Sequence, residues 1–117
     1  MRTIIAGGRH FDDWELLERS VHHFRRSISS EITVISGGAR GADALGESYA
    51  IENELRMKVF PADWDTYGVS AGYRRNVEMA EYSEALIAFW DGKSKGTKHM
   101  IDIAWDKGLI VKVVMYE

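Results

Sequence analysis

Apolar runs alternate along this chain with segments of helical periodicity, and this alternation constrains the fold more than any other feature. The strand-like runs are "TIIA", "ITVIS", "KVF", "EALIAFW" and "LIVKVVM", which begin at residues 3, 32, 58, 84 and 109. Between the first two runs, Leu17, Val21, Phe24 and Ile28 recur at helical spacing. Strands that alternate with helices predict right-handed crossovers and a parallel sheet covered on both faces.

We therefore expect an α/β fold: a Rossmann-like, three-layer single domain over 1–117 with a five-stranded parallel sheet. The expected helices begin at Asp12, where Asp12 and Glu15 have capping-box form, at Ala42 and at Ser70, and the last one ends near Gly108. The pattern alone does not determine the strand order. With the order 3-2-1-4-5, which we adopt, a ligand would bind between strands one and four at their carboxyl ends.

Composition excludes several classes of protein. Of the 117 residues, 45% are hydrophobic and 28% are charged, which is typical of a globular domain. The formal charge of -3 argues against a domain whose task is to coat nucleic acid, although a local basic patch is compatible with it. Without cysteine there is no disulfide or thiolate metal site, and no histidine pair has a zinc-ligand context. No signal peptide or membrane helix is recognisable, so we expect a cytoplasmic protein.

Three predicted strands end in glycine and polar residues: "GGRHF" from residue 7, "GGARGAD" from residue 37 and "WDGKSKGT" from residue 90. In a parallel sheet these loops emerge on one edge, where glycine lets a ligand approach the backbone and a helix start presents free N–H groups to an anion. A single glycine pair often only makes a turn, and neither standard nucleotide motif is present. Three such loops on one edge favour an anion-binding site.

The segment "FPADWDTYGVSAGYRRNVEMAE", from residue 60, is expected to be a polar loop that leads into a helix. Trp64 and Tyr67 could stack on a base or lie over the core, and the sequence favours neither. Arg74 and Arg75 open the helix, where cations oppose the helix dipole unless an anion is near.

Two carboxylates stand out. Asp43, at a helix start, could cap amides, bind a ribose hydroxyl or orient Arg40. Asp91, at the end of the expected central strand, is a weak catalytic candidate, as is Arg75; no catalytic residue is otherwise assigned.

Taken in order, "TIIAGGRHFDDW", "VISGGARGADALGESYA", the segment from residue 60 and "WDGKSKGTKHMIDIA" resemble the YspA-like branch of the SLOG superfamily over nearly the whole chain. These are small Rossmann-like domains frequent in bacteria and their phages. The superfamily includes Lonely-Guy phosphoribohydrolases, the DNA-processing protein of natural transformation and sensors of NAD-derived nucleotides. The resemblance implies a nucleotide-like ligand, with Gly37, Gly38 and Gly41 on its phosphate side, and a homo-oligomer.

The chain also departs from the related pattern. The phosphoribohydrolases carry P-G-G-x-G-T-x-x-E; aligned on Gly96 and Thr97, this chain has Met100 in place of the glutamate that assists glycosidic cleavage. Asp102 lies two residues further round the helix and would point elsewhere. In "AGYRRN", Tyr73 replaces a common proline, which would alter the rim of the pocket.

We expect the domain to bind a nucleotide or nucleotide-derived small molecule. Whether it also hydrolyses an N-glycosidic or phosphate bond is left open. The alternative is a module that binds nucleic acid or protein through the same basic edge, with nucleic acid the disfavoured partner. We expect no metal, no other cofactor and no membrane partner. The predicted ligand-binding residues are Gly7, Gly8, Arg9, Gly37, Gly38, Arg40, Gly41, Asp43, Trp64, Arg75, Asn76, Asp91, Gly92, Ser94, Gly96 and Thr97.

Overall fold

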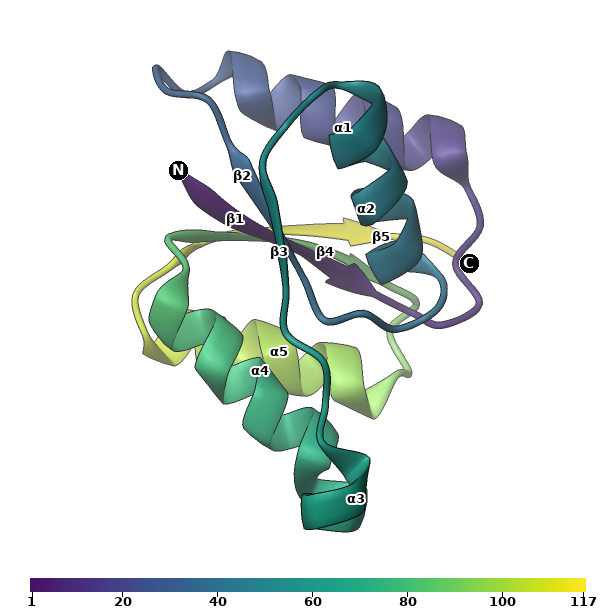
Figure 1. The fold of residues 1–117 in the computed structure, drawn as a ribbon. Coiled ribbons are helices and arrows are strands. Elements are labelled where there is room, and N and C mark those ends of the chain that lie inside the picture. Colours follow the sequence, from purple (N-terminus) through teal and green to yellow (C-terminus); the bar gives the residue numbers. More distant parts are fainter.

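A computed structural model describes residues 1–117 as a five-stranded parallel sheet in the order β3-β2-β1-β4-β5, with helices on both faces (Figure 1). This confirms the predicted fold class and strand order. The strands are β1 (Arg2–Gly7), β2 (Thr33–Ser36), β3 (Met57–Val59), β4 (Ala85–Trp90) and β5 (Ile110–Met115). The helices are α1 (Trp14–Arg26), α2 (Ala42–Glu52), α3 (Trp64–Tyr67), the 3-10 turn η1 (Gly68–Ser70), α4 (Ala71–Tyr82) and α5 (Lys95–Asp106).

The sheet separates two apolar cores. Helices α1 and α2 cover one face, and α4 and α5 cover the other (Figure 1). The central strands β1 and β4 are buried on both sides, with Ile4, Ile5, Leu86 and Ile87 fully inaccessible to solvent. This is why their sequences are continuous apolar runs rather than alternating ones. None of the helices has both the length and the apolar character needed to cross a membrane.

The start of α1 differs from the prediction by one residue. Asp13, not Asp12, caps the helix, and its Oδ1 accepts a hydrogen bond from the N–H of Leu16 at 3.0 Å. The carbonyl of Asp12 instead accepts from the N–H of Trp14 at 3.0 Å, so Asp12 belongs to the preceding turn. Two adjacent aspartates offer the same cap chemistry, and the turn geometry selects the second.

Two further helix ends are informative. Helix α5 ends at Asp106, and Gly108 follows with a φ of +78°, which confirms Gly108 as its stop signal. The predicted loop from residue 60 contains the short helix α3, which the sequence pattern did not predict. Its cap is Asp63, whose Oδ1 accepts from the N–H of Thr66 at 3.1 Å.

The first two glycine turns touch backbone to backbone. The carbonyl of Gly8 accepts from the N–H groups of Phe11 and Ala42, both at 3.2 Å. Gly41, at the N-cap of α2, has a φ of +75°, and an added Cβ would lie 2.2 Å from the Gly8 carbonyl oxygen. Glycine is therefore required at residue 41 both for the backbone angle and for the space. This contact brings the start of α2 against the carboxyl end of β1.

We predict that Gly41→Ala lowers the free energy of unfolding by at least about 2 kcal/mol, because the new methyl group forces strained backbone away from Gly8. Urea denaturation measures this loss. Gly96→Ala is the matched control, since a Cβ at residue 96 would meet nothing within 4 Å and Gly96 has no positive φ. Equal stability of the two variants would contradict the prediction.

Candidate functional site

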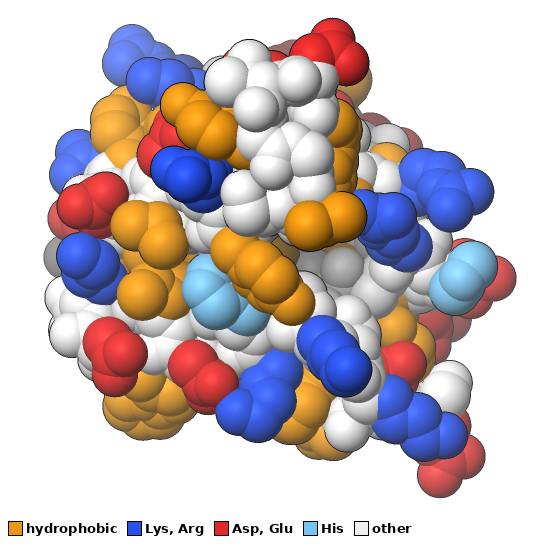
Figure 2. All heavy atoms as spheres, turned by 90° about the horizontal axis from the view of Figure 1, so that it is seen from below, with side chains coloured by type: hydrophobic (Ala, Val, Ile, Leu, Met, Phe, Trp, Pro, Cys, Tyr) orange, Lys and Arg blue, Asp and Glu red, His pale blue; other side chains and the backbone are white.

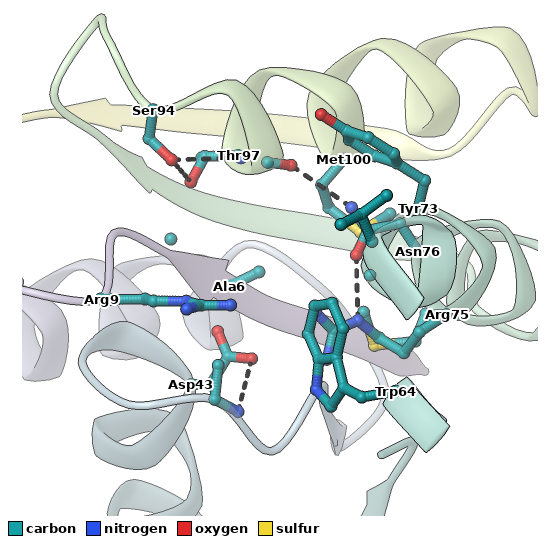
Figure 3. A pocket seen from close by; sticks show the side chains of 16 residues that line it. Ala6, Arg9, Asp43, Trp64, Tyr73, Arg75, Asn76, Ser94, Thr97 and Met100 are labelled. Carbon is teal, nitrogen blue, oxygen red and sulfur yellow. Dashed lines mark hydrogen bonds between the residues drawn. The ribbon is translucent and has the colours of Figure 1, made fainter. Parts of the chain in front are cut away.

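A cleft of about 230 Å³ opens at the carboxyl ends of β1 and β4, which is the predicted switch point of the sheet (Figure 3). Its walls come from the end of β1, the start of α2, the α3–α4 segment and the start of α5. The predicted residues that line it are Gly7, Arg9, Asp43, Trp64, Arg75, Asn76, Ser94, Gly96 and Thr97. Sequence reasoning missed the remaining lining residues Ala6, Ala39, Val69, Gly72, Tyr73, Met79 and Met100 as ligand contacts.

The missed residues are small or apolar. Met79 and Met100 are each 1% exposed and recur at core positions of their helices, so nothing in the sequence separates them from ordinary core residues. Tyr73 could have been identified from the sequence, since it replaces the proline common in related chains. Its ring meets the ring of His99 edge-on, with the centroids 4.6 Å apart, at the rim of the cleft.

Arg75 connects three walls of the cleft. Its Nη1 donates to the carbonyl of Gly37, and its Nε donates to Oδ1 of Asn76 at 3.2 Å. The amide Nδ2 of Asn76 donates to the carbonyl of Gly96 at 3.3 Å and lies 3.2 Å from Nδ1 of His99. An added Cβ on Gly37 would lie 2.7 Å from the Arg75 guanidinium, so a side chain at residue 37 would block this contact. Helix α4 is thus tied to the β2–α2 turn and to α5.

The cleft carries excess positive charge. Burial lowers the pKa of Arg75; the negative charge of Asp43 opposes this shift, and the positive charge of Arg9 adds to it. Neither arginine has a carboxylate within 4 Å, since the ion pairs of the molecule all lie elsewhere. Figure 3 shows Arg9 reaching into the cleft from the side opposite Arg75 and Trp64. Two guanidinium groups that face one cleft favour an anionic ligand.

Asp43 is 4% exposed and lies in the first turn of α2. Its Oδ2 accepts from the N–H of Ala39 at 3.3 Å. Burial raises the pKa of Asp43, while the Ala39 N–H and the charge of Arg75 oppose that shift. The structure shows Asp43 bonded to an amide of the glycine turn before α2; it caps no N–H of the helix itself. Its charge also complements the dipole of α2.

Three N–H groups of the glycine turn after β2 are bonded within the chain. The N–H of Gly38 donates to Oγ of Ser36 at 3.1 Å, the N–H of Ala39 donates to Asp43, and the N–H of Ala42 donates to the carbonyl of Gly8. The Asp43 carboxylate lies where the start of α2 would attract an anion. The N–H groups of Gly37, Arg40 and Gly41 make no hydrogen bond, so a phosphate-binding role for this turn stays a prediction. Gly8 and Gly41 line no part of the cleft and serve the backbone contact described above.

The start of α5 is different. Its first turn has no acidic residue, and the N–H groups of Lys95 and Gly96 make no hydrogen bond. The cap is Ser94, whose Oγ accepts from the N–H of Thr97 at 3.4 Å and lies 3.1 Å from the Thr97 hydroxyl. Gly96 leaves the space in front of these donors open. This helix start can therefore receive an anion from the cleft.

Asp91 and Gly92 do not line the cleft. Oδ1 of Asp91 accepts from the N–H groups of Ser94 at 2.9 Å and Lys93 at 2.8 Å, and these two bonds lower the pKa of Asp91. Gly92 has a φ of +81° in the same turn. Both residues therefore shape the loop that leads into α5, and the position of Asp91 disfavours a catalytic role.

Trp64 forms a wall of the cleft rather than a cover of the core. Its side chain is largely accessible to solvent, at 49% exposure, and lies close to Gly72, where an added Cβ would be 3.4 Å from the indole. Tyr67 does not line the cleft; the guanidinium of Arg74 lies over its ring, 4.2 Å from the centroid. The indole of Trp64 is therefore free to contact a ligand.

Met100, at the position of the related glutamate, lies buried in the floor of the cleft and cannot ionise. Asp102 is on the exposed side of α5, and its Oδ2 lies 2.7 Å from Nζ of Lys98, as its position on the helix predicted. Asp43 is consequently the only carboxylate among the residues that line the cleft.

We predict that Asp43 makes the protein less stable as the pH rises. Because burial raises its pKa in the folded state, the folded protein holds a proton that the unfolded chain releases. The stabilisation is complete below pH 3.8, the ordinary pKa of the group, and is lost as the pH passes through the raised value. Urea denaturation of the wild type and of Asp43→Asn over a pH series measures it. The stability difference between them, wild type minus variant, should fall with rising pH; a difference that rises would contradict the prediction.

Comparisons with known proteins show the family and the fold of the chain. Residues 1–67 match the model of the YspA, cpYpsA-related SLOG family. The chain is 32% identical over 120 residues to the Gene 61 protein of Mycobacterium phage D29. The alignment covers 94% of this chain and 93% of that protein.

Among solved structures, DNA processing protein A of Streptococcus pneumoniae superposes with a TM-score of 0.78 over 99% of this chain, at 15% identity. The chain spans 50% of that protein, and the likeness shows a shared fold. The match to the family model and the phage relative together establish that the chain belongs to the YspA, cpYpsA-related SLOG family.

Proposed function

We propose that the protein binds a nucleotide or a nucleotide-derived small molecule in the cleft between β1 and β4. The observation that carries this proposal is the meeting of two guanidinium groups, Arg9 and Arg75, with the open start of α5 in one cleft. An anion held there would relieve the repulsion between the two arginines.

The phosphate of the ligand would lie at the start of α5. The N–H groups of Lys95 and Gly96 are available there, and the hydroxyls of Ser94 and Thr97 bond only each other and the helix cap. A phosphate accepts from all these donors at once and complements the helix dipole. The start of α2 is unsuited to the same task because Asp43 already occupies it.

The rest of the cleft suits a sugar and a base. The Asp43 carboxylate lies inside the cleft and can accept a hydrogen bond from a ribose hydroxyl. The Trp64 indole offers an aromatic surface on which a base can stack, and Val69 and Tyr73 extend that apolar rim. Figure 2 views the molecule from the side of α4 and α5. It shows a hollow with hydrophobic side chains on one side and Lys and Arg side chains on the other.

A second candidate function is nucleic-acid binding at the same edge. Arg9, Arg40, Lys93 and Lys95 are exposed and form no ion pair. Such a basic strip would contact phosphates in a salt-dependent manner. A gel shift that appears at low salt and is lost as salt rises would support this function, and no shift at low salt would remove it. Cytoplasmic location and a homo-oligomer stay predictions.

We expect at least one nucleotide to bind with a dissociation constant below the millimolar range. Isothermal calorimetry with AMP, ADP, GTP, NAD, ADP-ribose and cyclic dinucleotides measures this, and chromatography of free base and phosphate after incubation tests for hydrolysis. No heat and no thermal shift with any member of the panel at millimolar concentration would overturn the proposed function.

We predict that Trp64→Ala weakens binding of the nucleotide so identified by about tenfold, because base–aromatic stacking is lost. The fold should be unaffected, since the side chain is largely exposed. Trp105→Ala is the matched control: Trp105 is 64% exposed and lies in the last turn of α5, at the opposite end from the cleft. Equal affinities of the two variants would show that the indole of Trp64 does not contact the ligand.

A further inference from the structure

A second cleft of about 310 Å³ lies beside the first, beyond Trp64. The glycine turn from Gly37 to Arg40 forms one side of it, and Pro61 and Ala62 form the other. Arg9, Trp64 and Arg75 line both clefts, so one ligand can pass from the first to the second along these shared residues.

The charge of the second cleft is one-sided. Three arginines line it, namely Arg9, Arg40 and Arg75, and no aspartate or glutamate does. None of the three has a carboxylate within 4 Å. Burial is the main cause of the lowered pKa of Arg75, and the positive charge of Arg9, which lines the same cleft, adds to it. Three unpaired guanidinium groups around one cleft, in a chain with a net charge of -3, form a site for an anion.

The lining also indicates the size and kind of that anion. Apart from the shared indole, the apolar lining is limited to Ala39, Pro61 and Ala62, so a second aromatic ring would find no flat partner there. Guanidinium groups are suited to bidentate hydrogen bonds with phosphate oxygens. The second cleft therefore fits a phosphate group better than a second base.

We propose that the ligand is a nucleotide with two phosphate groups, the second of which binds between Arg40, Arg9 and Arg75 in the cleft beyond Trp64. This rests on the proposed function, since the first cleft must hold the nucleotide. The glycine turn after β2 then contributes to anion binding through the Arg40 side chain. Glycine at residue 37 keeps a side chain away from the Arg75 guanidinium.

The small ligand is favoured over a nucleic-acid strand by the charge of the chain. A strand needs a basic track that continues beyond a few phosphates, whereas the net charge here is -3 and the unpaired arginines converge on one cleft. Nucleic acid therefore enters as an outcome of the test.

The experiment compares affinities by calorimetry at fixed salt. The ligands are the 5′-monophosphates, 5′-diphosphates and 3′,5′-bisphosphates of the four common nucleosides, together with a single-stranded octanucleotide. Arg40→Gln is the test variant, and Arg19→Gln is its matched control, because Arg19 is exposed on α1 and makes no hydrogen bond or ion pair. Thermal unfolding of both variants checks that the fold is intact.

We expect a diphosphorylated nucleotide to bind about tenfold more tightly than its monophosphate, because it makes one more set of charge-assisted hydrogen bonds. Arg40→Gln should abolish that gain, so that the diphosphorylated nucleotide binds no more tightly than its monophosphate, and Arg19→Gln should preserve the gain. Binding of monophosphates without any gain, a gain that survives Arg40→Gln, or an octanucleotide that outcompetes every nucleotide would overturn this inference and leave the first cleft intact. If no mononucleotide binds at all, the proposed function itself fails.

Discussion

The cleft depends on the guanidinium of Arg75, which bonds the carbonyl of Gly37 and the side chain of Asn76, and through Asn76 reaches the start of α5. This partly buried cation is tolerated because carbonyl and amide oxygens accept hydrogen bonds from it and the Asp43 charge is near. No carboxylate neutralises it directly. The same group therefore holds α4 against the sheet edge and leaves the cleft short of one negative charge, so structure and ligand preference arise from one side chain.

The starts of α2 and α5 face the same cleft with opposite electrostatics. Helix α2 carries Asp43 in its first turn, where the carboxylate accepts the N–H of Ala39 and its negative charge complements the helix dipole. Helix α5 has no acid there, and the Lys95 and Gly96 N–H groups remain available. The two helix starts therefore suit different groups of a ligand. The start of α5 suits an anion, and the Asp43 carboxylate at the start of α2 suits a hydroxyl group. A ligand with a phosphate at one end and a sugar beside it matches that arrangement.

Much of the fold and the location of the site could be predicted from the sequence. The predictions that failed concern the roles of individual polar residues. The strands and the edge that carries the site follow from buried runs and glycine turns, which are local signals in Ile4, Ile87 or Gly41. The strand order 3-2-1-4-5 did not follow from the pattern; it was adopted, and the structure has it. The roles of individual polar residues could not be predicted in this way, because they depend on contacts made only in the folded chain. Asp91 stands at the expected strand end, but its carboxylate folds back onto the Ser94 and Lys93 N–H groups. Likewise the pattern could not show whether the glycine turn faces solvent or Asp43, because that depends on where α2 begins.

Met100 leaves the cleft able to bind an anion but removes the glutamate that assists glycosidic cleavage in the related enzymes. A glutamate there would place a second carboxylate near the phosphate site, whereas the thioether adds apolar surface and leaves the charge of the arginines unopposed on that side. The remaining carboxylate, Asp43, already accepts the N–H of Ala39, and burial raises its pKa. Under the proposed function, this arrangement favours retention of the anionic ligand over cleavage of its glycosidic bond. The protein would then sense or sequester the nucleotide, with its selectivity set by the arginines around Trp64.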